Sequence, residues 1–243
     1  MAGIAPLKSI ILPAISKHTA TVIFVHGLGD TGAGWEPVGD MFSSEMPHVK
    51  WIFPHSPMIP ITANGGMKMP GWFDITSFGF DSGEDGAGMR KSEYQLNQII
   101  SGEVDAGIPA NRVVLGGFSQ GGAMTLLTGL SSERKLAGLA VLRLPFAAGD
   151  VAIQPSEYAK SLPIFWGQGQ IDPLVRPELA IASARMVIEK TKTPEVKETA
   201  NGKFAEFKGS LFEFKTYSNV AHSTSQQELN DLKEWLKKTL PEE

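Results

Sequence analysis

Residues 112–130 read RVVLGGFSQGGAMTLLTGL, and this stretch decides the fold expected for the chain. Residues 113–115 favour a short buried strand, and the apolar residues after the glycines recur at helical spacing. Between them, Gly117-x-Ser119-x-Gly121 has the spacing of a nucleophile elbow, the sharp strand-to-helix turn that exposes a serine hydroxyl. The glycines on either side of the serine avoid the clashes that a Cβ atom would cause there. We therefore predict a strand, a strained turn carrying the serine and a helix.

The composition limits the class of protein. The chain has 243 residues, a length that one α/β domain reaches, and we expect residues 1–243 to form a single domain. Its net charge of -4 offers no basic face for phosphate backbones, so no nucleic-acid partner is expected. Zero cysteines exclude disulfides, thiolate metal sites and a cysteine nucleophile. Without a secretory signal pattern or an apolar run of about 20 residues, we expect a cytoplasmic protein.

Strand-like runs alternate with helix-like segments along the chain, which predicts an α/β fold with a mostly parallel sheet and helices on both faces. The expected strands are residues 4–12 (at an edge), 19–26, 49–53, 138–144, 162–166 and 211–217. The expected helices are residues 89–100, with a cap near Asp85, 177–190 and 224–240. Residues 191–208 are polar and charged, so we expect a surface excursion there rather than a core element.

The first strong strand-like run ends in a glycine-rich loop that has two interpretations. Gly27-x-Gly29-x-x-Gly32 matches the dinucleotide-binding fingerprint after a strand. That fingerprint needs an acidic residue at the end of the next strand, and residues 49–53 are followed by Pro54 instead. In a serine hydrolase, such a loop lends a backbone N–H to the oxyanion hole. We favour this second interpretation over a nucleotide-dependent oxidoreductase.

Residues 56–81 show no regular periodicity but are rich in apolar side chains. Long apolar loops are uncommon in compact domains and are often functional. One interpretation is that this loop walls an acyl-binding groove, and the alternative is ordinary packing beneath a loop. Glu84 and Asp85 follow it, and for them we favour helix capping or a solvated role over a metal site.

A serine hydroxyl needs a base within hydrogen-bond reach and a carboxylate that orients the base. In the α/β-hydrolase order the acid follows the serine, and the histidine follows the acid. Of the five histidines, only His222 lies beyond Ser119, in a loop after a strand. Asp172 directly follows the strand at residues 162–166, and Asp150 is the alternative acid. We favour Asp172.

Two backbone groups are expected to stabilise the oxygen of the tetrahedral intermediate. One is the N–H of Gln120, next after the nucleophile, and the other is the N–H of Leu28 in the early glycine-rich loop. Removing one such donor typically costs about two to three orders of magnitude in turnover.

Several blocks of the chain occur in an order typical of one family. The blocks are VHGLGDTG (25–32), GWFD (71–74), GGFSQGG (116–122), DPLV (172–175) and AHS (221–223). Together they resemble the acyl-protein thioesterase and lysophospholipase family, the phospholipase/carboxylesterase group of α/β-hydrolases. The resemblance implies hydrolysis of thioesters on S-acylated proteins, with lysophospholipids and short carboxylic esters as further substrates. It implies no metal and no organic cofactor.

The resemblance also implies roles for individual residues. It makes Ser119, Asp172 and His222 the catalytic triad and gives the oxyanion hole to Leu28 and Gln120. Within the matched blocks, the residues expected to bind substrate are Trp72, Phe73, Leu174 and Val175.

Three features depart from the pattern of that family. Gln168 stands where histidine is usual, Arg143 stands where serine usually follows the strand, and the segment at residues 191–210 is longer than expected. We expect Arg143 to pair with a surface carboxylate rather than to bind an anionic substrate. Because these residues adjoin the expected acyl pocket, the departures affect substrate preference more than the chemistry.

Other functions stay open at this point. A broad carboxylesterase of short-chain or lipid esters uses the same acyl-enzyme chemistry. A non-catalytic lipid-binding module shares the fold, although the ordered Ser, Asp and His argue against it. The expected partners are an S-acylated protein or a lipid ester. The apolar residues at 56–81 are compatible with transient contact with a membrane surface, and we expect a monomer or a weak homodimer.

Overall fold

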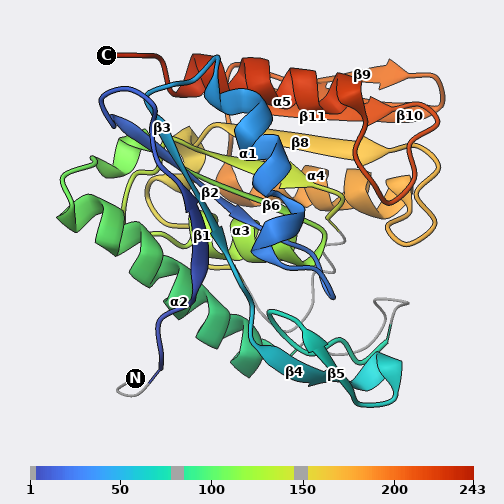
Figure 1. Ribbon diagram of the computed structural model, residues 1–243. Helices are drawn as coiled ribbons and strands as arrows, with labels where there is room; N and C mark the ends of the chain where they lie inside the picture. Colours follow the sequence, from blue (N-terminus) through green and yellow to red (C-terminus); the bar gives the residue numbers. More distant parts are fainter. Residues whose placement is uncertain (1–3, 78–84, 145–152) are drawn as a thin grey trace.

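A nine-stranded β-sheet forms the centre of the computed structural model, which describes residues 4–77, 85–144 and 153–243 (Figure 1). The strand order is β1-β3-β2-β6-β7-β8-β11-β10-β9. The parallel central strands are β3 (Val49–Pro54), β2 (Ala20–Val25), β6 (Val113–Phe118), β7 (Gly138–Leu142), β8 (Ile164–Gly169) and β11 (Phe212–Tyr217). The antiparallel strands are β1 (Ser9–Leu12) at one edge and β10 (Phe204–Lys208) with β9 (Lys197–Asn201) at the other. The predicted mostly parallel sheet is confirmed.

Helices cover both faces of this sheet (Figure 1). On one face lie α1 (Glu36–Ser43) and α5 (Gln226–Thr239), and on the other lie α2 (Gly86–Asp105), α3 (Gln120–Leu130) and α4 (Pro177–Thr191). Short 3-10 helices occur at Gly32–Gly34, Thr62–Asn64, Ala110–Arg112 and Ala159–Ser161. Because both faces are covered, consecutive residues of a central strand are all buried, which explains the continuous apolar runs in the sequence.

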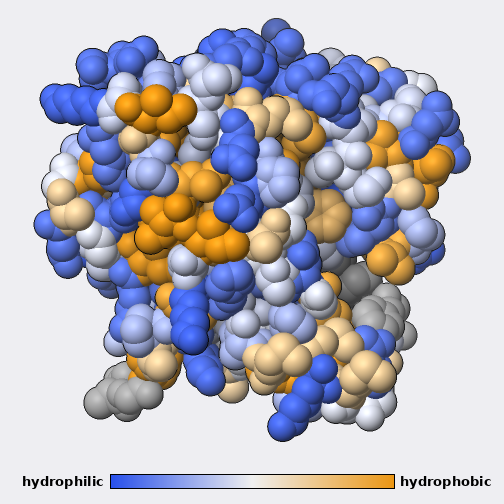
Figure 2. Space-filling view, in the orientation of Figure 1, coloured by the Kyte–Doolittle hydropathy of each residue, from blue (hydrophilic) through white to orange (hydrophobic). Residues whose placement is uncertain are grey.

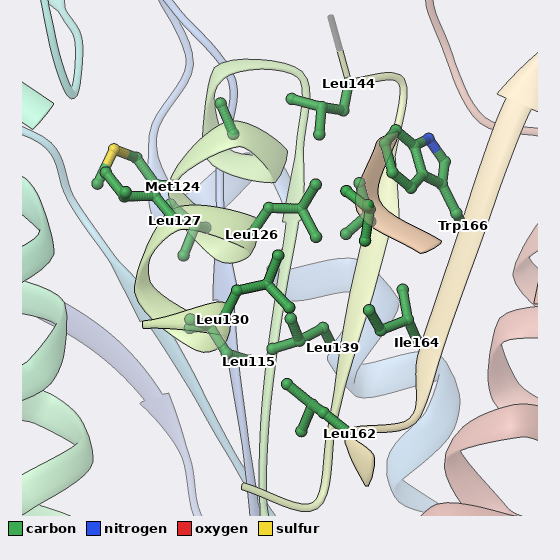
Figure 3. Close-up of a cluster of buried hydrophobic side chains, with 14 of the residues drawn as sticks. Leu115, Met124, Leu126, Leu127, Leu130, Leu139, Leu144, Leu162, Ile164 and Trp166 are labelled. Atoms are coloured by element: carbon green, nitrogen blue, oxygen red, sulfur yellow. The ribbon is translucent and has the colours of Figure 1, made fainter. Parts of the chain in front are cut away.

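The larger hydrophobic core surrounds α3, every residue of which is buried. Figure 3 shows Leu126 and Leu130 of this helix beside Leu115, Leu139 and Ile164 of the neighbouring strands, whereas Met124 points to the other side of the helix. A helix that is apolar on all sides is typical of a buried element. The helix that follows Ser119 is therefore held firmly against the sheet.

The carboxyl ends of the parallel strands lie at one edge of the sheet. Val25 pairs with Gly117, and Phe118 pairs with Leu142, so neighbouring strands end close to the same level. The residues that follow these ends include His26 after β2, Ser119 after β6, Arg143 after β7, Asp172 after β8 and His222 after β11. In parallel sheets, ligand sites lie outside this edge.

The stretch at residues 56–81 contains regular structure that the sequence pattern did not predict. β4 (Met58–Ile61) and β5 (Met67–Pro70) form a separate antiparallel hairpin. Its turn includes Gly65 and Gly66, whose φ angles of 64° and 77° lie in the left-handed region that glycine adopts without steric cost. Apolar residues occupy both the exposed and the buried positions of β4, where Met58 is exposed and Ile61 is buried, so the sequence shows no alternation of polar and apolar residues.

The expectation that residues 191–208 form a surface excursion is wrong. β9 and β10 extend the main sheet, and Phe204 and Phe207 are buried in the larger core. β9 is an edge strand whose side chains are mostly exposed, so its residues are polar and do not show the apolar pattern by which a strand is predicted. Gly202 and Lys203 form the two-residue turn between these strands, and Gly202, at a φ of 63°, occupies its first position, where glycine is favoured.

Close backbone contacts at the turn before α3 leave no room for side chains at Gly117 and Gly121. A Cβ atom on Gly121 would lie 2.1 Å from Val25 O, and one on Gly117 would lie 2.3 Å from Gly121 O. Both obstacles are backbone atoms, so no side-chain rotation relieves them. We expect Gly121→Ala to lower the free energy of unfolding by about 3 kcal/mol or more, as measured by denaturant titration.

Gly102→Ala is the matched control for this substitution. Gly102 lies inside α2, and a Cβ atom there would meet nothing within 4 Å. Alanine should stabilise this helix by about 0.5–1 kcal/mol. Equal stability of Gly121→Ala and the wild type would show that the two strand-end segments are not in close contact.

Candidate active site

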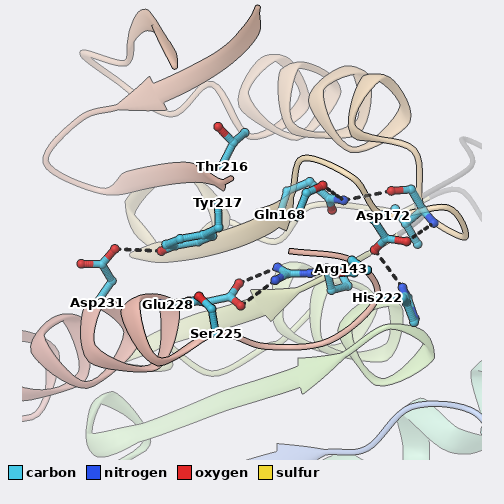
Figure 4. Close-up of polar contacts among 12 residues, drawn as sticks. Arg143, Gln168, Asp172, Thr216, Tyr217, His222, Ser225, Glu228 and Asp231 are labelled. Carbon is cyan, nitrogen blue, oxygen red and sulfur yellow. Dashed lines mark hydrogen bonds and ion pairs between the residues drawn. The ribbon is translucent and has the colours of Figure 1, made fainter. Parts of the chain in front are cut away.

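Ser119, His222 and Asp172 form one hydrogen-bonded chain. His222 Nε2 lies 3.0 Å from Ser119 Oγ, and His222 Nδ1 lies 2.8 Å from Asp172 Oδ2 (Figure 4 shows the latter contact). With Nδ1–H donating to the carboxylate, Nε2 is free to accept the proton of the serine hydroxyl. This arrangement can remove a proton from Ser119 and stabilise the imidazolium that results.

Ser119 occupies a strained position between β6 and α3. Its φ and ψ angles are 53° and −120°, a conformation that costs a residue with a side chain roughly 1–3 kcal/mol. Two hydrogen bonds hold it there: the Ser119 N–H donates to Leu142 O at 2.8 Å, and the Ala123 N–H donates to Ser119 O at 3.1 Å. The geometry matches the sharp strand-to-helix turn predicted from the glycine spacing.

Asp172 is 3% exposed and is held as a carboxylate by several donors. Its Oδ1 accepts the N–H groups of Leu174 and Val175, each at 2.9 Å. Burial alone would raise the pKa of Asp172, but hydrogen bonds from His222, Val175 and Leu174 outweigh it and hold the pKa below the ordinary value. The group therefore stays charged and can orient the imidazole.

The loop that carries His222 lies against the end of β8. The Ile171 N–H donates to Val220 O at 3.2 Å, and a Cβ atom on Gly169 would lie 2.2 Å from that same oxygen. The His222 ring also packs edge-on against Phe118, with ring centroids 5.0 Å apart. The backbone and the ring of His222 are thus both supported.

The glycine-rich loop after β2 lies beside Ser119. A Cβ atom on Gly27 would lie 3.4 Å from Ser119 Cβ, at van der Waals contact, so the backbone of this loop runs next to Ser119. The loop is fixed by the Gly29 N–H, which donates to Pro70 O at 2.8 Å. Gly32, the last glycine of the nucleotide-like pattern, packs against Phe53 O, which a Cβ atom would approach to 2.3 Å. Close packing therefore requires glycine at position 32, whereas Gly29 has a φ of 79° in the left-handed region and no atom near the position of a Cβ.

Buried polar side chains brace this loop. His26 donates from Nδ1 to Gly27 O at 2.7 Å, and its Nε2 accepts the Ser56 N–H at 3.1 Å. Burial lowers the pKa of His26, so the ring stays neutral and keeps the lone pair that the Ser56 contact requires. His26 therefore has a structural role, for which its position directly after a strand was the only sequence signal.

Gln120 connects the turn that carries Ser119 to residues 71–74, the block expected to bind substrate. Its Oε1 accepts the Trp72 N–H at 2.8 Å, and its Nε2 donates to Phe73 O at 2.7 Å. The indole N–H of Trp72 donates to His26 O at 2.8 Å. The sequence predicted a role for the backbone of Gln120 and gave no sign of this side-chain bridge.

The four residues expected to bind substrate differ in exposure. Trp72 and Val175 are each 1% exposed, Phe73 is half-buried against the larger core, and Leu174 is 55% exposed. Leu174 and Val175 belong to the same turn as Asp172, whereas Trp72 and Phe73 are tied to Gln120. Leu174 and Val175 thus contact Asp172 itself, whereas Trp72 and Phe73 contact the residue that follows Ser119. Of the four, Leu174 has the most exposed side chain.

Comparison with known proteins gives the family. Residues 7–206 match the phospholipase/carboxylesterase family. The chain belongs to this family. Acyl-protein thioesterase 1 of Cryptococcus neoformans var. neoformans serotype D is 42% identical over 238 residues, which cover 96% of this chain and 98% of that protein. Acyl-protein thioesterase 1 of Neurospora crassa is 39% identical over 254 residues, with 99% and 95% covered.

Solved structures agree with this assignment. Arabidopsis thaliana SOBER1 has a TM-score of 0.77 at 32% identity, covering 91% of this chain and 99% of that chain. Zea mays acyl-protein thioesterase 2 has a TM-score of 0.78 at 22% identity, covering 96% and 99%, and is similar in fold. The predicted α/β-hydrolase fold is confirmed. As a phospholipase/carboxylesterase family member, the chain is a serine hydrolase acting on ester or thioester bonds.

Gln168, one departure from the expected family pattern, supports the turn that carries Asp172. Its side chain is fully buried, and Nε2 donates to Val175 O at 2.9 Å and to Gly169 O at 3.1 Å. Since Val175 also donates to Asp172, Gln168 braces the far side of the same turn.

Arg143 does not pair with a surface carboxylate as expected. Its partner is Glu228 of α5, and both side chains are 0% exposed. Arg143 Nη1 and Nη2 donate to the two carboxylate oxygens at 2.5 and 2.7 Å (Figure 4). Burial raises the pKa of Glu228, and the bidentate contact with the guanidinium opposes that rise. The prediction that Arg143 pairs with a carboxylate is confirmed, but the prediction that this carboxylate lies at the surface is wrong.

The remaining acidic candidates, membrane-spanning segments and metal sites can also be compared with the structure. Asp85 caps α2 by accepting the Gly88 N–H, as predicted, whereas Glu84 and Asp150 lie outside the described residues. Within residues 4–77, 85–144 and 153–243, no helix has the length and apolarity of a membrane span. Across the same ranges, no three histidine or acidic side chains gather as they would around a metal ion.

Proposed function

We propose that this chain is an acyl-protein thioesterase that hydrolyses the thioester of S-acylated proteins, including palmitoylated ones, and also carboxylic esters or lysophospholipids. The observation that carries the proposal is the hydrogen-bonded chain from Asp172 through His222 to Ser119, with the serine on a strained turn. The names of the relatives at 42% and 39% identity support the choice of substrate. No cofactor takes part in the proposed reaction.

The proposed reaction has two steps. Ser119 Oγ attacks the acyl carbonyl carbon while His222 Nε2 takes the hydroxyl proton, and the tetrahedral intermediate collapses when His222 returns that proton to the leaving thiol or alcohol. Water then attacks the acyl-serine with His222 again as base, which releases the fatty acid and restores the hydroxyl. Asp172 orients the ring throughout.

We assign the oxyanion hole to the backbone N–H groups of Leu28 and Gln120. Gln120 is the first residue of α3, so its N–H has no acceptor within the helix. Leu28 follows Gly27, the residue that lies beside Ser119 Cβ. Donors from a helix start and a rigid loop are already oriented when the negative charge develops, which is what transition-state stabilisation requires.

The acyl chain is proposed to bind along Trp72, Phe73, Leu174 and Val175. Leu174 offers its exposed side chain beside the Asp172 turn, and Phe73 is half-buried. Trp72 and Val175 would form the buried wall behind them.

Transient contact with a membrane surface is proposed for the β4–β5 hairpin. Met58 and Met67 are 61% and 66% exposed, and Figure 2 shows moderately hydrophobic side chains over this hairpin. Flexible thioether side chains suit an irregular apolar partner.

We further propose that residues 1–243 form one domain and that the protein is a monomer or a weak homodimer. We also propose a cytoplasmic location, which the absence of cysteine supports.

The test is hydrolysis of matched acyl thioesters and oxygen esters with acyl chains from two to sixteen carbons, including an S-palmitoylated peptide. We expect the highest kcat/KM with long-chain thioesters. An optimum with short-chain oxygen esters would instead make the chain a broad carboxylesterase. Lack of turnover on every member, by folded protein, would favour a non-catalytic lipid-binding module.

A further inference from the structure

The guanidinium of Arg143 touches two separate points of the segment that contains His222. Its Nε donates to Ala221 O at 3.2 Å, and its two terminal nitrogens hold both oxygens of Glu228. Ala221 directly precedes His222, and Glu228 lies in the first turn of α5. A single buried cation therefore binds the chain on both sides of the base (Figure 4).

The backbone of Arg143 and that of its partner Glu228 are both held in place. The Arg143 N–H donates to Gly167 O at 3.0 Å, which ties the end of β7 to β8. Arg143 also has a φ of 53°, an unfavourable value for a residue with a side chain, which the surrounding contacts must maintain. On the other side, Ser225 caps α5 by accepting the Glu228 N–H at 3.2 Å.

The space around the pair fits a charged carboxylate closely. A Cβ atom on Gly167 would lie 2.1 Å from Glu228 Oε1, so the glycine provides the room that the carboxylate fills. Arginine presents its donors in a fixed planar fork that matches two carboxylate oxygens. Burying an ion pair adds little net stability, whereas the bidentate contact fixes the position of Glu228 relative to Arg143.

We propose that Arg143 is a positioning residue for the general base, because it holds Ala221 O and Glu228 together and so fixes the backbone from which His222 reaches Ser119. This inference rests on the proposed function, since it assumes that His222 acts as the base. Arg143 touches neither the substrate nor the reacting atoms and acts through the backbone of the base loop. Loss of the contact with Ala221 would let the imidazole drift, and misplacement by about 1 Å can lower turnover about a hundredfold.

The test compares Arg143→Met with the double variant Arg143→Met/Glu228→Met. The single variant leaves a buried carboxylate without its partner and should lower Tm by about 10 °C. The double variant removes both charges at similar side-chain volume and should regain most of that stability. If Arg143 positions the base, both variants lose about ten- to a hundredfold in kcat while KM stays within about twofold.

Arg112→Met is the matched control. Arg112 is also a buried arginine that holds backbone oxygens, donating to Thr19 O at 2.9 Å and to Pro241 O at 2.7 Å. It precedes β6, at the opposite end of the strand from Ser119 and about 20 Å away along it. This variant should lose stability and keep the kcat of the wild type.

Proton NMR gives a readout that stability alone would not change. The His222 Nδ1–H bonded to Asp172 should give a low-field resonance in the wild type, and we expect it to broaden or disappear in the folded double variant. A double variant with wild-type kcat and an unchanged resonance would overturn the proposal and leave the pair a purely structural role. If Arg143→Met does not fold, the kcat and the His222 resonance of the double variant test the proposal on their own. Absence of Ser119-dependent hydrolysis in the wild type would instead count against the proposed function.

Discussion

We expect Ser119→Ala to lower kcat/KM for thioester and ester substrates by about six orders of magnitude. Without the hydroxyl no acyl-enzyme can form, and only the weaker catalysis by the oxyanion donors and substrate binding remains. The fold should be retained, because the backbone hydrogen bonds of Ser119 to Leu142 and Ala123 do not involve the side chain. The measurement is steady-state hydrolysis of a long-chain thioester, with circular dichroism to establish folding.

Ser131→Ala is the matched control for this variant. Ser131 lies at the other end of α3, where its hydroxyl donates to Leu127 O at 2.6 Å. It should hydrolyse the same substrate at the wild-type rate. Substantial turnover by folded Ser119→Ala would mean that another group attacks the substrate.

Asp172→Asn has the second-largest expected effect, a fall of about four orders of magnitude in kcat. An asparagine amide can donate to His222 Nδ1, which stabilises the tautomer whose Nε2 carries the proton. That tautomer cannot take the proton of Ser119. The measurement is kcat on the same thioester at neutral pH, and a loss of less than tenfold would contradict the assigned role of Asp172.

The acid dependence of stability provides a second readout for Asp172. Because the pKa of this carboxyl is lowered in the folded state, the unfolded chain binds a proton first as the pH falls. The carboxylate therefore stabilises the fold fully above the ordinary aspartate value of about 3.9, and this contribution is lost as the pH falls through the folded pKa. Asp172→Asn should show a smaller loss of stability over that range.

The sequence indicated the candidate site because chain order and strand ends restricted the choice. His222 is the only histidine after Ser119, and Asp172 follows a strand directly. Buried central strands and α3 were also predictable, since apolar runs identify elements covered on both sides. The β9–β10 hairpin was missed because β9 is exposed and polar, and β4–β5 was missed because apolar residues occupy both its exposed and its buried positions.

The buried pair of Arg143 and Glu228 shows a different limit. Glu228 lies four residues before Leu232 on the apolar side of α5, which is a signal that this acid is buried. Arg143 interrupts an apolar run at the end of a strand, which signals a buried cation. Their pairing could not be predicted, because it depends on β7 and β8 being neighbours in the sheet and on α5 packing over them.

Covalent labelling with a fluorophosphonate tests most directly the central claim, that Ser119 is the activated nucleophile. The wild-type protein is treated with the reagent, its intact mass is measured, and the tryptic peptide spanning residues 113–134 is fragmented to locate the adduct. We predict one adduct per chain, on Ser119 and not on Ser131 or Ser132 in the same peptide, and none in Ser119→Ala. A folded wild-type protein that takes up no label, or carries it on a different residue, would contradict the account.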